Sequence, residues 1–350
     1  MHIKIYLKEE KIMKDGYKIV DIHTHFYTKP WLDFLAQRTE DPTFEWTSPT
    51  SGLAKVGGIP AGHVDKPATF DIKSRVEELD SLGIDVQVLS HTCPGVGEVS
   101  ESDAIEWATK INDTLAGFCE AYPGRFYFLM TVPCQNVDKA IGEMERAKKL
   151  PGAKGVQVFS NVNGTLISDP QFHPILEKAA DLSLPVKVHP AFTPLTADAM
   201  YKAKLPMQLF GFTLDTTMVL TLLLFQGFFE KLPNLKVIHS HLGGMAPYMM
   251  GRIDTAFKRY SKEFCVECTL PPSIGYKDHV YIDTLAMHVP AIKCAWEYMG
   301  IDHMLFGTDF PHRASGTVEG NLAILDEVGF SVEDKEKVLS KNAIKLFNLD

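Results

Sequence analysis

Eight short runs rich in β-branched residues recur along this 350-residue chain, separated by longer stretches with helical periodicity. This alternation is typical of repeated βα units built around a parallel sheet. The number of runs and the length of the chain together predict a (β/α)8 TIM barrel. The predicted strands are 18–23, 84–91, 126–132, 154–160, 185–189, 236–241, 280–284 and 303–309.

The loop after the first predicted strand argues against the main alternative, a doubly wound open sheet. That fold normally has a glycine-rich phosphate loop at this point, whereas residues 23–26 here read His-Thr-His-Phe. The segment that follows, about 26–70, is rich in Pro, Gly, Thr and aromatic residues and is too long for an ordinary βα loop. We therefore expect a single barrel domain over 1–350. Segment 26–70 is expected to be an inserted cap over the barrel mouth, with 191–212 helping to close it.

Charge and hydropathy argue against two classes of partner. The net charge is -9, and no block of Lys and Arg could follow a nucleic acid or an anionic membrane. The longest apolar stretch, 218–229, is interrupted by polar residues and is too short to span a membrane. The first 18 residues lack the apolar centre of a secretory signal. These features predict a cytoplasmic protein whose partner is a small molecule.

Imidazoles and a carboxylate stand at the ends of several predicted strands. His23 and His25 are two positions apart at the end of the first strand, so their side chains face the same way and can converge on one ion. The alternative for this pair is a hydrogen-bonded contact within the barrel rim. His189 ends the fifth strand and Asp309 ends the eighth, and a barrel gathers the carboxyl ends of its strands around one opening. These four residues are the candidate metal ligands.

The donor set favours one ion rather than two. Some binuclear barrels use a carbamylated lysine at the end of the fourth strand. The nearest lysine here, Lys154, stands at the opposite end of that strand. Imidazoles with a carboxylate suit Zn2+ best and also accommodate Mn2+ or Fe2+, because no thiolate takes part. We expect one divalent ion, with Zn2+ as the first choice.

Further histidines stand near the same strand ends. His241 opens a His-Leu-Gly-Gly turn after the sixth strand, where the glycines leave the backbone open to a substrate. An imidazole titrates near neutrality, which suits an acid/base role beside a metal ion. His239 is either a rival for that role or a buried, hydrogen-bonded residue. His91 and His312 are expected to line the pocket.

The chain resembles the amidohydrolase superfamily, in the branch of the carboxymuconate-semialdehyde, γ-resorcylate and 5-carboxyvanillate decarboxylases. The likeness covers nearly the whole chain from Ile19 onward and rests on four motifs. They are Asp21-Ile22-His23-Thr24-His25; Val188-His189-Pro190; His241-Leu242-Gly243-Gly244 followed by Gly251-Arg252-Ile253; and Gly307-Thr308-Asp309-Phe310-Pro311.

The resemblance implies a metal-dependent, non-oxidative decarboxylase that acts on an aromatic or unsaturated carboxylic acid. Carried over residue by residue, it makes His23, His25, His189 and Asp309 the metal ligands. It makes His241 the catalytic base, and we expect Asp309 to serve also as a second proton carrier.

The resemblance also implies that Arg252 reaches a substrate carboxylate in a neighbouring subunit, so that the active unit is a homodimer. Arginine suits bidentate carboxylate recognition; the alternative is a helix-surface arginine in a salt bridge. Two other functions stay open. The same ion and base could hydrolyse a lactone, ester or amide, or a catalytically silent barrel could bind a ligand or a protein.

Overall fold

The computed structural model describes residues 16–192, 194–264, 266–312 and 316–349. Residues 1–15, most of the segment that we predicted to lack a secretory signal, lie outside the described residues. Within the described ranges, no helix combines the length and the apolar character needed to cross a lipid bilayer.

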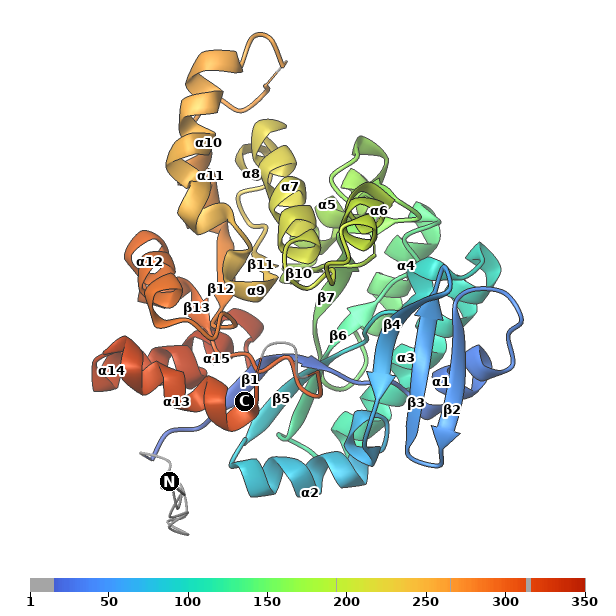
Figure 1. Ribbon diagram of the computed structural model, residues 1–350. Helices are drawn as coiled ribbons and strands as arrows, with labels where there is room; N and C mark the ends of the chain where they lie inside the picture. Colours follow the sequence, from blue (N-terminus) through green and yellow to red (C-terminus); the bar gives the residue numbers. More distant parts are fainter. Residues whose placement is uncertain (1–15, 193, 265, 313–315, 350) are drawn as a thin grey trace.

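Eight parallel strands form the central sheet, in the order β1-β5-β6-β7-β10-β11-β12-β13 (Figure 1). The chain after β13 closes the ring against β1: the Ile22 amide donates to the Phe306 carbonyl at 3.0 Å, and the Asp309 amide donates to the His23 carbonyl at 2.7 Å. The predicted TIM barrel is therefore confirmed. The strands are β1 (Val20–His25), β5 (Val86–Ser90), β6 (Phe126–Thr131), β7 (Ala153–Phe159), β10 (Val186–His189), β11 (Val237–His239), β12 (Val280–Asp283) and β13 (Met304–Leu305).

Helices follow the strands around the barrel, and several begin at a side chain that caps the first turn. Asp71 accepts a hydrogen bond from the Ser74 amide before α2, and Ser100 accepts one from the Asp103 amide before α3. The helices are α2 (Ile72–Leu82), α3 (Glu101–Ala121), α4 (Val137–Ala147), α5 (His173–Asp181), α6 (Pro194–Lys202), α7 (Gly211–Phe225), α8 (Phe228–Lys231), α9 (Ser240–Gly243), α10 (Ala246–Tyr260), α11 (Pro272–His279), α12 (Val289–Met299), α13 (Val318–Val328), α14 (Val332–Glu336) and α15 (Asn342–Phe347).

Two predicted elements differ from the observed ones. The eighth strand was predicted over 303–309, but β13 ends at Leu305, and the backbone at Asp309 is left-handed with φ of 58°. The helical periodicity over 216–232 predicts a single helix, whereas the observed helix begins earlier, at Gly211, and is broken into α7 and α8 at Gly227. Gly227 has φ of 63°, a conformation that ends a helix at little cost only for glycine.

The segment between β1 and α2 contains α1 (Lys29–Ala36) and a three-stranded antiparallel sheet of β2 (Thr43–Ser48), β3 (Ser51–Val56) and β4 (Ile59–Val64). This sheet lies at one side of the barrel, beside α1 (Figure 1). Gly62 on β4 lies against the barrel rim, where a Cβ atom would be only 2.9 Å from the Cys93 carbonyl oxygen. The close approach therefore requires glycine and brings β4 to the mouth of the barrel.

Candidate metal centre and active site

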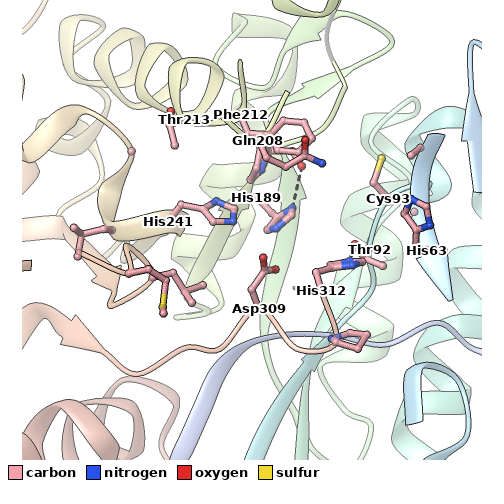
Figure 2. Close-up of a pocket in the computed structure, with 18 of the residues that line it drawn as sticks. His63, Thr92, Cys93, His189, Gln208, Phe212, Thr213, His241, Asp309 and His312 are labelled. Carbon is pink, nitrogen blue, oxygen red and sulfur yellow. Dashed lines mark hydrogen bonds between the residues drawn. The ribbon is translucent and has the colours of Figure 1, made fainter. Parts of the chain in front are cut away.

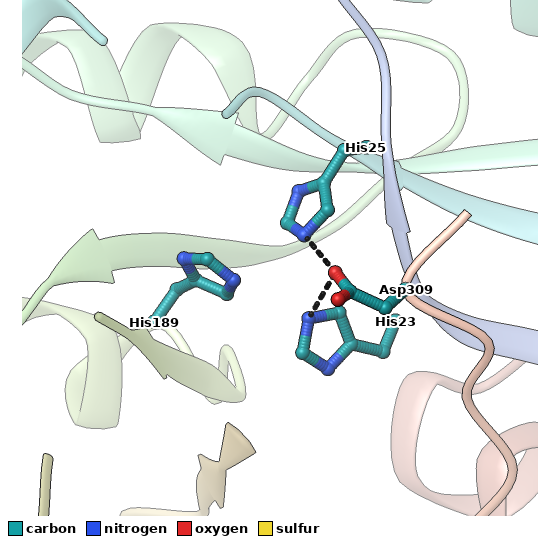
Figure 3. A group of neighbouring side chains, drawn as sticks. All are labelled: His23, His25, His189 and Asp309. Atoms are coloured by element: carbon teal, nitrogen blue, oxygen red, sulfur yellow. Dashed lines mark ion pairs between the residues drawn. The ribbon is translucent and has the colours of Figure 1, made fainter. Parts of the chain in front are cut away.

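The four candidate ligands meet at the C-terminal rim of the barrel. His23 and His25 lie on β1, His189 ends β10, and Asp309 follows β13 (Figure 3). One ligand atom from each lies within 4.8 Å of the others, and all four residues are buried. Residues from three distant parts of the chain therefore share a space suited to one ion.

Hydrogen bonds assign the proton position on two of these imidazoles. His23 Nδ1 lies 2.6 Å from Asp283 Oδ2, and His189 Nδ1 lies 2.9 Å from the Pro190 carbonyl oxygen. A carboxylate and a carbonyl only accept, so Nδ1 donates in both cases and Nε2 keeps its lone pair. Both Nε2 atoms are buried and have no hydrogen-bond partner within the described part of the chain. They are free to bind a cation.

Burial keeps the imidazoles of the centre neutral. Desolvation lowers the pKa of His25 to about 3 and lowers the pKa values of His23 and His189 well below their ordinary value. Asp309 Oδ1 lies 3.0 Å from His25 Nε2 and 3.6 Å from His23 Nε2. Burial raises the pKa of Asp309, but the contacts with His25 and His23 outweigh it and hold that pKa below its usual range. Three nitrogen donors and one oxygen donor, all buried and close together, fit a divalent ion.

Gly307 permits the close contact between the two ligand-bearing segments. A Cβ atom at this position would lie 2.6 Å from the Cβ atom of His23. Any larger residue would push the chain after β13 away from β1. The glycine in the Gly-Thr-Asp motif therefore sets the distance between Asp309 and the histidines.

Asp283, the last residue of β12, links the metal centre to the turn that contains His241. Its Oδ2 atom accepts hydrogen bonds from His23 Nδ1 at 2.6 Å and from the His241 amide at 2.9 Å. Its Oδ1 atom accepts from the amides of Leu242 and Leu285, at 2.8 and 3.1 Å. Asp283 was not among the residues predicted from the sequence. The available signal was an acidic side chain at the end of a buried strand, Val-Tyr-Ile-Asp.

His241 lies in a tight turn just after β11. The backbone is left-handed at His241, with φ of 58°, and at Leu242, with φ of 56°. Such backbone is uncommon outside glycine, and here the Asp283 carboxylate binds both amides and stabilises it. The ring centroid of His241 lies 4.9 Å from that of His23 and 5.5 Å from that of His189. Its Nδ1 atom is buried and has no hydrogen-bond partner within the described ranges. The imidazole is therefore placed beside the metal centre and is free to exchange a proton.

His239 belongs to the barrel interior rather than to the active site. It is fully buried, and its Nδ1 atom lies 2.8 Å from the Tyr276 hydroxyl group. The sixth strand was predicted over 236–241, which would put His239 and His241 on one strand face. The observed strand ends at His239 and the chain then turns, so the two side chains do not share a face. Of the two interpretations, the buried, hydrogen-bonded histidine fits the structure.

His312 and His91 have different environments. His312 lines the cavity, its ring centroid 5.0 Å from that of His25. His91 does not line the cavity, so that expectation was wrong. Its ring is buried against Tyr27 and Trp31, with centroid distances of 5.9 and 5.5 Å, because α1 packs over the end of β5.

An open cavity of about 660 Å³ lies over the metal centre. Figure 2 shows His189, His241 and Asp309 facing it, with His312 on the side away from His241. The side chains around it fall into a polar group and an apolar group. The polar ones include His63, Asp65, Thr92, Gln208 and Thr213, and the apolar ones include Phe212, Leu242, Leu285 and Met287.

Arg252 lies outside this cavity in the single chain. It is exposed on α10, and it is not among the described residues that line the cavity. The single chain therefore does not place Arg252 against a substrate in this cavity.

A closed (β/α)8 barrel with three imidazoles and a carboxylate at its C-terminal rim defines a class of metal-dependent barrel enzymes. The family model described as amidohydrolase matches residues 20–349. The chain belongs to this amidohydrolase family.

Curated relatives and solved structures match over most of their lengths. The chain is 31% identical over 334 residues to a 2-amino-3-carboxymuconate-6-semialdehyde decarboxylase of Dictyostelium discoideum, covering 95% of this chain and 92% of the relative. It is 28% identical over 299 residues to a γ-resorcylate decarboxylase of a Rhizobium species, covering 79% and 87%. A 5-carboxyvanillate decarboxylase of Novosphingobium aromaticivorans, solved with manganese and 4-hydroxy-3-methoxy-5-nitrobenzoic acid, superposes with a TM-score of 0.82 at 26% identity, covering 96% and 97%.

Proposed function

We propose that this protein is a metal-dependent, non-oxidative decarboxylase that acts on an aromatic or unsaturated carboxylic acid. One observation carries the proposal: His189 and Asp309 of the four-ligand centre line the same cavity as His241, whose buried Nδ1 atom has no hydrogen-bond partner among the described residues. The two curated relatives above are decarboxylases of the same kind of acid. The hydrolase alternative is not favoured, because these relatives break a carbon–carbon bond.

His23, His25, His189 and Asp309 would hold one divalent ion. When bound, the ion supplies Lewis acidity that stabilises negative charge on a substrate oxygen. We place Zn2+ first, because imidazole and carboxylate donors are common zinc ligands. The manganese in the solved relative makes Mn2+ the alternative to test.

His241 would deliver the proton that the reaction needs. A proton adds to the ring or diene carbon that bears the carboxylate, using a π electron pair, and when the bond to the carboxylate then breaks its electron pair restores the π system. Protonated His241 donates this proton before carbon dioxide leaves, and the neutral imidazole then takes a proton from water. Asp309 would act as a second proton carrier beside its role as a ligand. Leu242, Leu285 and Met287 reduce the water around the departing carboxylate.

Arg252 is proposed to bind the substrate carboxylate in the active site of a partner subunit. Tyr248 stands four residues earlier on α10, so the two side chains share one face of the helix. Tyr248 is 86% exposed in the single chain. Tyrosine and arginine are both enriched in protein interfaces. The active unit would be a homodimer in which each subunit completes the other's cavity.

The chain is further proposed to work as one domain, with segment 26–70 as its cap. Support comes from β4, where Ala61, Gly62 and His63 line the cavity beside the barrel residues. The cap would supply one wall of the substrate site.

A direct assay separates the candidate functions. The metal-loaded protein is incubated with a panel of hydroxybenzoates and carboxymuconates, and released carbon dioxide is measured; lactone hydrolysis is followed with the same preparation. We expect carbon dioxide release that is lost in His241→Ala. Lactone turnover without carbon dioxide would favour the hydrolase. Turnover of neither class, with weak metal retention, would favour a silent barrel.

A further inference from the structure

A fully buried arginine, Arg75 on α2, contacts the backbone of the metal centre. Its Nε atom donates to the Ala68 carbonyl at 2.6 Å, and its Nη2 atom donates to the His25 carbonyl at 2.7 Å. Its Nη1 atom donates to Thr24 Oγ1 and to Gln87 Oε1, both at 2.9 Å. One guanidinium thus binds the ligand strand β1, the neighbouring strand β5 and the last part of the cap segment. All four of these acceptors are neutral.

The contacts of Arg75 extend to the segment after β13. Thr24 Oγ1, which accepts from Arg75, donates in turn to the Phe310 carbonyl at 3.0 Å. The His25 amide donates to the same oxygen at 2.6 Å. The Phe310 ring also packs on Arg75, with its centroid 4.3 Å from the guanidinium carbon. Phe310 directly follows Asp309. Arg75 therefore contacts the backbone of the ligand His25 directly and reaches the backbone beside the ligand Asp309 through Thr24.

The positive charge of Arg75 is compensated indirectly, by the Asp21 carboxylate. Gln87 Nε2 donates to Asp21 Oδ2 at 2.8 Å, so the glutamine links the guanidinium to a buried carboxylate. Burial lowers the pKa of Arg75 to about 9, which leaves it a cation at neutral pH. A buried charge without a directly paired carboxylate is costly. The buried guanidinium lies against the backbone of His25 and Phe310, which points to a role in holding this backbone in place.

We propose that Arg75 is a positioning residue for the metal centre. It fixes the His25 carbonyl directly and the chain beside Asp309 through Thr24 and Phe310. The guanidinium has five N–H groups in one fixed plane and can donate to several acceptors at once, whereas the single ammonium group of a lysine cannot reach all of them. The inference rests on the proposed ligand set and does not depend on the reaction that the site performs.

The test measures Zn2+ affinity in Arg75→Lys by competition with a chromophoric chelator, on protein shown to be folded by circular dichroism. Lysine keeps the charge but cannot make four contacts. We expect the affinity to fall by roughly 10–100-fold, the usual effect of removing a group that orients metal ligands. The visible spectrum of the Co2+-substituted protein should change as well, because the ligand geometry changes.

Arg125→Lys is the matched control. Arg125 also donates to a backbone carbonyl, that of Ile84, and it pairs with Asp80. It stands just before β6, at the opposite end of the barrel from the metal centre. Its substitution should leave Zn2+ affinity and the Co2+ spectrum unchanged.

The outcomes separate positioning from simple stabilisation. A Zn2+ affinity of Arg75→Lys within twofold of the parent, an unchanged Co2+ spectrum and only a lower melting temperature would overturn the proposal. If Arg75→Lys does not fold, Thr24→Val decides, because it removes only the hydroxyl group that accepts from Arg75 and donates to the Phe310 carbonyl. It should weaken Zn2+ binding by about tenfold, and unchanged binding would overturn the proposal. A parent protein without Zn2+ affinity would instead contradict the ligand set, whereas an absence of decarboxylase activity would leave this test intact.

Discussion

Replacement of Asp283 by asparagine should weaken metal binding and lower activity together. The four donors around its carboxylate are His23 Nδ1 and the amides of His241, Leu242 and Leu285, at 2.6 to 3.1 Å. Asparagine has nearly the same shape but carries an amide NH2 group, a donor, in place of one carboxylate oxygen. Whichever way the amide turns, two of the four donors then face another donor.

The expected magnitude follows from the contacts. A hydrogen bond to a charged group contributes about 1.5–3 kcal/mol, so two lost bonds amount to about 3–6 kcal/mol before the site relaxes. Part of this loss appears in metal binding, because His23 loses the partner that orients it. A loss of about 10–100-fold in affinity is usual for such a partner, or about 1.4–2.8 kcal/mol. The rest should appear as a lower free energy of unfolding, because the left-handed turn at His241 loses its support.

Chelator competition measures the metal affinity of Asp283→Asn, and urea titration of the metal-free protein measures its stability. Turnover is then measured at saturating metal, where kcat should remain low because His241 is displaced. Asp302→Asn is the control, since Asp302 is 70% exposed and pairs with Lys337 at the surface. Metal affinity of Asp283→Asn within twofold of the parent, together with an unchanged kcat, would refute this role of Asp283.

Four further outcomes are expected. His189→Ala should lose bound metal, whereas His241→Ala should keep metal and lose turnover. Elemental analysis and carbon dioxide release, measured on the same samples, check this. The reverse pattern would contradict the assignments. Mixed dimers of Arg252→Ala and His241→Ala subunits should regain partial activity. One of the two active sites in each mixed dimer then has an intact His241 and an intact Arg252 from the partner subunit. No recovery of activity would argue for a site within one chain. Removal of the ion with a chelator should lower the melting temperature and added Zn2+ should restore it, because an ion that binds only the folded state stabilises that state; a melting temperature that does not respond speaks against a metal centre. Burial lowers the pKa of His91 to about 3 from an ordinary 6.5. Between pH 3 and pH 6.5, His91 is therefore protonated in the unfolded chain but neutral in the folded protein. Its contribution to stability is complete above pH 6.5 and falls by about 1.4 kcal/mol per pH unit below it. His91→Gln should therefore flatten the acid side of the stability curve by one proton, as urea titrations at pH 7 and pH 5 can measure, and an unchanged slope would contradict this.

The barrel and the meeting of its ligands were accessible from sequence for a geometric reason. Alternating strand and helix patterns define βα units, and a closed ring brings every strand end to one rim. Residues as distant as His23 and Asp309 could therefore be placed together without any knowledge of loop structure. The direction in which the chain turns after a strand does not follow from this alternation. For that reason, the separate environments of His239 and His241 were not foreseen.

Features that depend on packing between segments could not be read from the pattern. Asp283 is one acidic residue among many, and its role appears only when four donors from three segments surround it. Arg75 stands in an ordinary amphipathic helix, yet it is fully buried. His91 ends a predicted strand as the ligands do, but α1 covers it. The sheet formed by β2, β3 and β4 was predicted only as an inserted cap without strands, because these short strands lack a clear alternation of apolar and polar residues.

A crystal structure of the metal-loaded, active protein, with anomalous data collected at the absorption edge of the bound ion, tests the central claim most directly. We predict a single anomalous peak between His23, His25, His189 and Asp309. Samples with a higher metal occupancy at this peak should show proportionally higher turnover. A peak elsewhere on the barrel, or full turnover from protein that shows no peak at these four residues, would contradict the account.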